Sequence, residues 1–344
     1  MDHDPIDLSV IVAARNAATT LPAQLEALAA QRGDGHWELI VADNGSTDAT
    51  AELVRRRAAD WPELHLVDAS GQPGAGHARN LGALTARGRW LAFCDADDVV
   101  ADDWVTAITA ALAHTPLVAG RLDWERLNSP DLRRSRALPQ VDGLQSTDPL
   151  PGLGHAAASN LGVHAALFHA LGGFDLGARF LQDTDLCWRA QLSGTPLVFA
   201  PDAVVHMRLR RGLRGAWRQG RNTGMGERWL TTRYGRLAAQ PQPVGSPQRQ
   251  PSDSPQRQPR PLTPATTADP APAPDPAAAP DRRSLGPRRV LRRAGLVAGQ
   301  LARVRHHGDL AGLCWDLGFG VGFARGGLPD PEPYSAPEHH ALRA

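Results

Sequence analysis

Short apolar runs alternate with helical patterns over the first 200 residues. Leu8–Ala14, Trp37–Ala42 and Trp90–Cys94 are almost continuously hydrophobic, as in strands buried on both faces. Between the first two, Leu21–Gln31 carries leucines at helical spacing. This alternation predicts a doubly wound α/β fold, with a mainly parallel sheet, helices on both faces and functional residues at the strands' carboxyl ends. Further strands are expected at Leu64–Val67 and Leu197–Ala200, and helices at Ala49–Ala59, Ala75–Thr85, Asp102–Ala113, Leu161–Leu171 and Thr184–Leu192.

The pattern changes twice beyond this region. Residues 121–155 are irregular and rich in Pro, Gly and Asp, which predicts a mobile loop over the site. Between Gln240 and Asp281 there are thirteen Pro and almost no large apolar residues, as in a disordered linker. Arg288–Arg305 then reads as a basic amphipathic helix. We therefore expect a catalytic domain over residues 1–236, a linker over 237–285 and a basic amphipathic tail over 286–344.

Charge is divided unevenly along the 344 residues, although the formal net charge is only +1. Residues 1–202 hold 15 Arg against 26 acidic residues, a net of −11, and residues 203–344 hold 22 Arg against 10, a net of +12. The helical segment 207–236 alone has nine Arg and a single acid, Glu227. Codon bias could explain why every Lys or Arg position is Arg, but it does not explain why negative charge gathers in the first part of the chain and positive charge in the second. A basic half indicates phosphate, nucleic acid or a membrane surface as a partner.

Composition also narrows the class of protein. Cys94, Cys187 and Cys314 lie far apart without CxxC spacing, which argues against a disulfide scaffold or zinc knuckle and fits a reducing compartment. The N-terminus is acidic rather than basic, unlike a secretory signal, and no run of eighteen apolar residues occurs. We therefore expect a soluble or peripheral protein. The basic segments Arg208–Arg221 and Arg288–Arg305 add the expectation that it is cytoplasmic and peripheral at the inner face of the cell membrane.

Three acidic clusters follow strand-like runs. The first, Asp43–Asp48, fits a strand-to-helix turn in which Gly45 allows the bend and Ser46 or Asp48 caps the helix. On this pattern alone the structural interpretation is favoured about two to one. The alternative is that Asp43 accepts the imide N–H of a pyrimidine.

The second cluster places Asp95, Asp97 and Asp98 directly after a buried strand. Carboxylates so close repel one another unless a cation neutralises them, and hard oxygen ligands suit Mg²⁺ or Mn²⁺. The alternative is an acidic helix N-terminus that interacts with the helix dipole, and this would be enough to explain Asp98 and Asp102. It does not explain Asp95 and Asp97 on either side of Ala96.

The third cluster, Gln182–Asp185, precedes a helical pattern, and His206 ends a strand-like run. Asp185 fits a helix cap, and Asp183 is a weak signal by itself. A lone histidine is a metal ligand in roughly one case in five and otherwise structural.

In this order the motifs resemble the family 2 glycosyltransferases, which have the GT-A fold. The resemblance covers roughly the first 210 residues, and its specificity lies in seven motifs in sequence. They are Leu8–Asn16, Asp43–Asp48, Gly74–Gly82, Asp95–Asp98, Gly172–Asp175, Gln182–Leu186 and His206.

The resemblance implies an inverting glycosyltransferase with a nucleotide-diphospho-sugar donor and a divalent cation, Mn²⁺ or Mg²⁺. The acceptor would be a hydroxyl of a lipid-linked or cell-envelope saccharide. Asp183 would be the general base, and Asp97 would bind the metal, with His206 as a possible second protein ligand. The implied donor-binding residues are Ala14, Asn16, Asp43 at the base, Arg79 near the nucleotide and Asp95 at the ribose or sugar.

Two residues depart from the family pattern. Gln182 stands where the family usually has Glu, and Ala13 stands where it usually has Pro. Gln182 leaves open a catalytically weakened relative that acts as a binding partner. A third hypothesis, an Arg-rich nucleic-acid binder, is disfavoured because segment 207–236 has few aromatic residues for base stacking and no recognisable nucleic-acid motif.

Overall fold

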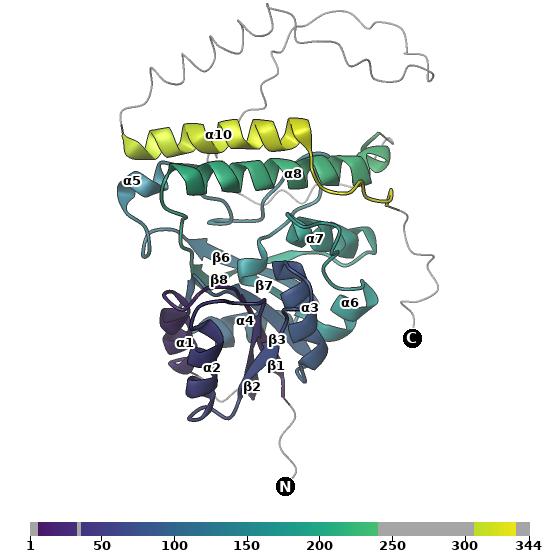
Figure 1. The fold of residues 1–344 in the computed structure, drawn as a ribbon. Coiled ribbons are helices and arrows are strands. Elements are labelled where there is room, and N and C mark those ends of the chain that lie inside the picture. Colours follow the sequence, from purple (N-terminus) through teal and green to yellow (C-terminus); the bar gives the residue numbers. More distant parts are fainter. Residues whose placement is uncertain (1–5, 33–35, 240–305, 335–344) are drawn as a thin grey trace, which may run out of the picture.

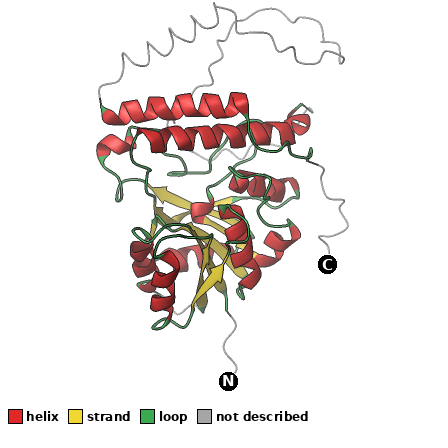
Figure 2. Ribbon diagram, in the orientation of Figure 1, coloured by secondary structure: helices red, strands yellow, loops and turns green. Residues whose placement is uncertain are grey.

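The computed structural model describes residues 6–32, 36–239 and 306–334. Its centre is one eight-stranded sheet of order β3-β2-β1-β4-β7-β6-β8-β5 (Figures 1 and 2). The strands are β1 Leu8–Ala14, β2 Trp37–Asp43, β3 Leu64–Asp68, β4 Trp90–Asp95, β5 Val99–Val100, β6 Leu117–Asp123, β7 Leu161–His164 and β8 Val198–His206.

The sheet is mixed, with four parallel and three antiparallel strand pairs. β1, β2, β3 and β4 are mutually parallel, and β7 then runs antiparallel to both β4 and β6. The expected α/β fold, with a mainly parallel sheet, is therefore confirmed. The antiparallel β7 was not expected, because short strands give little periodic signal.

Helices cover both faces of the sheet, as predicted. Val10 and Val12 of β1 point into the core with α1 and α4, whereas Ile11 points into the core with α6 and α7. This alternation follows from the period of two along a strand. The helices are α1 Leu21–Ala29, α2 Thr50–Ala58, α3 Ala75–Thr85, α4 Trp104–Leu112, α5 Pro130–Arg133, α6 Ala165–Ala170, α7 Gln182–Leu192, α8 Leu213–Ala238 and α10 His307–Arg325.

Two sequence-based assignments are corrected. The helix expected over Leu161–Leu171 is a strand followed by a helix, because Leu161–His164 pairs with β4 and β6 before α6 begins. Tertiary pairing here overrides an apolar pattern that also fits a helix. The irregular loop expected over 121–155 begins inside β6 and contains α5, and it is tied by a Gln145–His155 bridge.

A two-helix layer lies beyond the sheet, with α8 next to the domain and α10 outermost (Figure 1). The two helices touch through glycines. A Cβ on Gly224 would lie 2.1 Å from Phe319 O, and one on Gly322 would lie 2.0 Å from Arg221 O. Such contacts bring the two backbones together, as small residues allow in closely packed helices. The C-terminal segment that contains α10 therefore packs on the rest of the chain.

Some predicted segments cannot be compared with the structure. The basic helix expected at Arg288–Arg305 lies outside the described residues. So does the linker expected over 237–285, apart from its first three residues at the end of α8. Within the described part of the tail, α10 carries a single arginine, Arg325. No helix among the described residues is long and apolar enough to span a bilayer.

The glycine contacts predict opposite effects for two substitutions on α8. Gly224→Ala forces a methyl group onto the α10 backbone, and we expect it to destabilise the protein by about 1–3 kcal/mol, as overpacking does. Gly235→Ala meets nothing within 4 Å and should stabilise α8 by about 0.5–1 kcal/mol. Urea unfolding of both full-length variants measures the two changes. Equal changes in both variants would contradict close packing of α8 on α10.

Candidate active site

Strand register brings two predicted donor-binding carboxylates to the same edge of the sheet. Asp43 at the end of β2 lies beside Ala14, and Asp95 at the end of β4 lies beside Ala13. Because β1 runs between them in parallel, both carboxylates leave the sheet at its carboxyl edge. This is where ligands bind in open α/β sheets.

The loop after β1 is tied to the loop after β2. Asn16 adopts a left-handed conformation with φ of 51°, and its Oδ1 accepts from Thr47 N at 2.7 Å. Its own N–H donates to Ser46 Oγ at 2.9 Å, and that hydroxyl in turn bonds to Asp43. Asp43 therefore takes part in the strand-to-helix turn, and the same contacts hold its carboxylate at the strand end. Ser46 or Asp48 was expected to cap the following helix, but the N-cap residue of α2 is Ala49.

Three carboxylates converge after β4. Asp95, Asp97 and Asp98 each offer one oxygen, and these oxygens all lie within 4.8 Å of one another. Burial raises the pKa of Asp97, and the adjacent Asp95 raises it further. Burial raises the pKa of Asp98 well above its usual value, with Asp97 and Asp95 adding to the effect. Asp98 Oδ2 is buried without a hydrogen-bond partner among the described residues.

Asp98 does not mark a helix N-terminus, as the sequence had allowed. It is 1% exposed and accepts from Arg208 N at 2.7 Å, whereas the next helix begins only at Trp104. Arg208 Nε also donates to Asp97 O at 2.8 Å. The segment after β8 is thereby fixed against the carboxylate cluster. Sequence reasoning missed this contact because the partners are about 110 residues apart.

His206 lies at the end of β8, opposite Val99 of β5. Its Nδ1 contacts Asp123 Oδ2 at 2.5 Å. Burial acts to raise the pKa of Asp123, but this contact and the N–H groups of Glu125 and Arg126 lower it overall. The imidazole is therefore oriented by a carboxylate that the sequence analysis did not single out. His206 is outside the three-carboxylate group, so its role as a metal ligand remains a prediction.

Arg79 of α3 connects the three-carboxylate group to the third acidic cluster, Gln182–Asp185. Its Nη2 donates to Asp95 Oδ1 at 2.6 Å, in an ion pair that is mostly buried. Gln182, with its amide oxygen facing the arginine, accepts from Arg79 Nη1 at 3.0 Å. A glutamate at this position would place a second negative charge on Arg79. The neutral Gln182 keeps the hydrogen bond, so Asp95 is the carboxylate that pairs with the charge of Arg79.

Asp183 lies in the first turn of α7, and its Oδ2 accepts from Ala158 N at 3.0 Å. Burial raises its pKa, although that N–H and the charge of Arg79 act in the opposite direction. A carboxylate with a raised pKa is a better proton acceptor than an ordinary aspartate. The predicted base therefore has suitable chemistry.

Asp185 is not the helix cap that its position suggested. The residue at the N-cap is Leu181, with φ of 58° and no side-chain bond, and Asp185 is fully buried one turn further on. It accepts from Arg189 Nε at 2.7 Å and from Tyr234 OH at 2.7 Å. Arg233 Nε lies 3.2 Å from it. Asp185 thus anchors α8 to α7, a structural role that needs partners distant in sequence.

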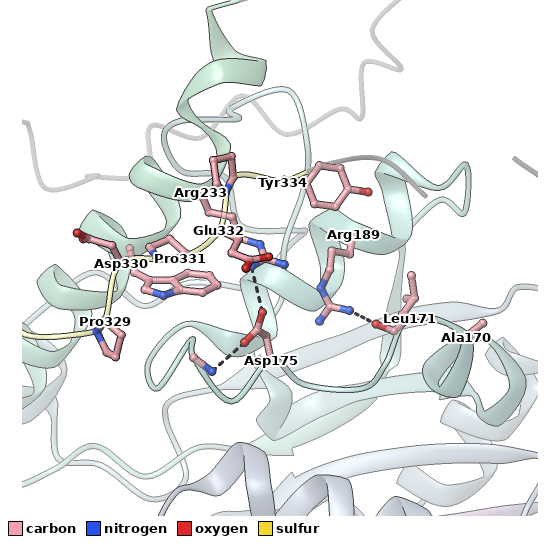
Figure 3. Close-up of a pocket in the computed structure, with 13 residues that line it drawn as sticks. Ala170, Leu171, Asp175, Arg189, Arg233, Pro329, Asp330, Pro331, Glu332 and Tyr334 are labelled. Carbon is pink, nitrogen blue, oxygen red and sulfur yellow. Dashed lines mark hydrogen bonds and ion pairs between the residues drawn. The ribbon is translucent and has the colours of Figure 1, made fainter. Parts of the chain in front are cut away.

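A cavity of about 580 Å³ lies under the C-terminal segment (Figure 3). Both of its arginines have partners: Arg233 Nη1 lies 3.1 Å from Asp175 Oδ2, and Arg189 Nη1 donates to the backbone carbonyl of Leu171 at 2.6 Å. Tyr334 N donates to Arg233 O at 3.0 Å and closes one side. The arginines in this cavity already have acceptors.

Comparison with known proteins shows a family resemblance for the segment that carries Asp43, Arg79 and the three clustered carboxylates. Residues 9–169 match the model of glycosyl transferase family 2. This part of the chain is similar to the glycosyl transferase family 2 domain. The succinoglycan biosynthesis protein ExoO of Rhizobium meliloti is 36% identical over 129 residues, covering 37% of this chain and 36% of that protein. The glycosyltransferase AglE of Haloferax volcanii is 26% identical over 202 residues, covering 57% and 65%. The chain thus spans less than two thirds of the length of both relatives.

Solved structures agree on the fold. The mannosyltransferase PcManGT from Pyrobaculum calidifontis, in complex with GDP-Man and Mn²⁺, gives a TM-score of 0.51 at 22% identity, over 66% of this chain and 65% of that one. GalNAc-T7 with UDP, GalNAc and Mn²⁺ gives 0.50 at 17% identity, over 67% and 48%. At these identities the likeness shows the fold alone, and the expected GT-A fold is confirmed.

Proposed function

We propose that the protein is an inverting, metal-dependent glycosyltransferase. It moves a sugar from a nucleotide-diphospho-sugar to a hydroxyl of a cell-envelope or lipid-linked saccharide. The observation that carries this proposal is the convergence of Asp95, Asp97 and Asp98 at the carboxyl edge of a family 2 domain. A carboxylate with the properties of a base, Asp183, is linked to that cluster through Arg79 and Gln182.

The carboxylate cluster fits a divalent cation. Its three oxygens lie close together, burial and mutual repulsion raise the pKa of Asp97 and Asp98, and Asp98 Oδ2 has no hydrogen-bond partner in the described residues. Hard oxygen ligands suit Mg²⁺ or Mn²⁺. Asp97 would be the principal ligand, with His206 as a further candidate. A cation held there would supply positive charge, which would offset the negative charge of the departing nucleoside diphosphate.

The chain's own residues activate the acceptor hydroxyl and position the donor. Asp183 takes the proton of the acceptor hydroxyl as the oxygen attacks the anomeric carbon. A new carbon–oxygen bond forms on one face while the bond to the diphosphate oxygen breaks on the other, which inverts the anomeric configuration. Arg79 holds Asp95 at the donor side, and Asp43, Ala14 and Asn16 shape the nucleotide end of the site.

A panel of nucleotide sugars, measured by thermal shift with and without Mn²⁺, tests the donor proposal. A donor that binds the folded state raises the melting temperature of the full chain by mass action. We expect at least one UDP-, GDP- or dTDP-sugar to do so with Mn²⁺, and to do so much less in EDTA. No shift with any donor under either condition would contradict the proposed function.

We also propose that the protein works at the inner face of the cell membrane, as a peripheral protein. α8 and α10 expose three large apolar side chains, Trp217, Leu317 and Phe323, at 38–40% each. α8 adds exposed arginines, among them Arg214, Arg218 and Arg221. Apolar side chains beside arginines favour an anionic lipid surface.

Vesicle co-sedimentation of the full chain tests membrane binding. The paired substitution of Leu317→Glu and Phe323→Glu should reduce binding to anionic vesicles at least fivefold, because both side chains are exposed on α10. Leu84→Glu is the matched control, since Leu84 is 70% exposed on α3. If all three proteins sediment equally, α10 has no part in membrane contact.

A further inference from the structure

Arg136 holds an enclosed positive charge without an acidic partner. It follows α5, and its Nε and Nη2 are buried with no hydrogen-bond partner among the described residues. Its Nη1 donates to the side-chain oxygen of Gln219 on α8. No ion pair of Arg136 occurs in residues 6–32, 36–239 and 306–334. Two of its three guanidinium nitrogens are thus left for another ligand.

Such an arrangement costs stability in the free protein. Burial, together with the like charge of Arg210, lowers the pKa of Arg136 to about 10. Buried cations in proteins are normally paired, because leaving a charge in a poorly solvated place without a counterion is expensive. The unsatisfied donors therefore favour an anion that accepts from Nε and Nη2. A phosphate matches the planar guanidinium fork.

The segment that carries Arg210 is fixed against the carboxylate cluster. Arg208, two residues before Arg210, donates from its N–H to Asp98 Oδ1 at 2.7 Å and from Nε to Asp97 O at 2.8 Å. Leu209, the residue before Arg210, is fixed by Asn128, whose Oδ1 accepts from Leu209 N at 2.8 Å. Both arginines meet the first turns of α8: a Cβ on Gly215 would lie 3.6 Å from Arg210 Cβ, and Arg136 donates to Gln219 one turn further along the helix.

We propose that Arg136 and Arg210 bind a phosphate group of the acceptor, next to the donor diphosphate. The inference rests on the proposed function and deepens it, since it names the acceptor as a phosphate-bearing molecule. A cation at Asp95, Asp97 and Asp98 would already offset the donor diphosphate. Arg136 and Arg210 remain for a second anion, because neither has an ion pair within the described chain.

Calorimetric titration of inorganic phosphate into the full chain tests the site. Arg136→Gln should weaken phosphate binding at least tenfold, because it removes the unpartnered donors. Arg210→Gln, at an exposed position, should weaken it at least threefold. Arg134→Gln is the matched control, since Arg134 is exposed in the same segment, and it should stay within twofold of the wild type. Equal affinities in all four proteins, or no binding to the wild type, would overturn the proposal.

Thermal unfolding in chloride separates binding from a structural role. Because it removes an unpaired buried charge, Arg136→Gln should melt at or above the wild-type temperature without phosphate. A lower melting temperature, together with unchanged phosphate affinity in Arg210→Gln, would instead make Arg136 a structural residue and overturn the proposal.

UDP and GDP binding with Mn²⁺ distinguishes the acceptor phosphate from the donor diphosphate. We expect Arg136→Gln to bind whichever nucleotide the wild type binds within twofold of the wild-type affinity. A loss as large as that for phosphate would assign the arginines to the donor and overturn the acceptor assignment. Phosphate binding that depends on Arg136, with no nucleotide binding in any variant, would support the anion site and contradict the proposed function.

Discussion

Asp97→Asn should lower the rate of sugar transfer by about 10³-fold or more, the equivalent of about 4 kcal/mol in the barrier. Asp97 lies in the three-carboxylate group, and the amide removes a negative oxygen from the proposed cation site. Without the cation, the negative charge on the departing diphosphate is not offset. Initial rates across a range of Mn²⁺ concentrations measure the effect.

A matched control tests whether losing any nearby carboxylate would have the same effect as losing Asp97. Asp103→Asn removes a nearby carboxylate that is exposed and makes no side-chain cap bond, so its rate should stay within twofold of the wild type. Asp97→Asn should fold normally, since it relieves repulsion between buried acids. Full activity in Asp97→Asn would refute the assignment of the cluster.

Asp183→Asn should separate donor binding from chemistry. We expect donor affinity within about twofold of the wild type and a transfer rate lower by about 10²–10⁴-fold, the usual contribution of a general base. An asparagine oxygen can still accept from Ala158 N, so the local fold should be retained. Asp202→Asn, at an exposed position on β8, is the control. Loss of donor binding in Asp183→Asn would give this residue a different role.

The pH dependence of transfer follows from the environment of Asp183. Burial raises its pKa above the usual aspartate value, and the base must be deprotonated to act. The rate should therefore fall as the pH decreases through this raised pKa, at a higher pH than an ordinary aspartate would give. The deprotonated form is the costly one in the folded protein, so Asp183→Asn should not lower stability at neutral pH. A pH profile of kcat that is flat above pH 4 would contradict a buried base.

The strands near the N-terminus and the site edge could be predicted from sequence because their signals are local. α3 occupies Ala75–Thr85 as expected, and β1, β2 and β4 end at or within one residue of the expected positions. Parallel strands in register then bring Asp43 and Asp95 to one edge without further information. The order of the strands along the chain was therefore enough to predict where Asp43 and Asp95 lie.

The rest of the site depends on contacts that no local pattern reports. The burial of Asp98 depends on Arg208, and that of Asp185 on Tyr234, partners about 110 and 49 residues away. β6 lies at the start of a segment whose Pro, Gly and Asp content indicated a loop, because pairing with β7 and β8 determines its conformation. Arg136 could not be singled out either, since an unpaired arginine is recognised only when its surroundings are known.

Electron paramagnetic resonance of Mn²⁺ tests whether the cluster of Asp95, Asp97 and Asp98 holds a cation together with a nucleoside diphosphate. The full chain is titrated with Mn²⁺ in the presence of the nucleoside diphosphate of its donor, and the bound ion is examined for coupling to ³¹P. We expect one bound Mn²⁺ per chain with phosphorus coupling in the wild type and in Asp103→Asn, and loss of that signal in Asp97→Asn. An unchanged signal in Asp97→Asn, or Mn²⁺ bound without phosphorus coupling in the wild type, would contradict it.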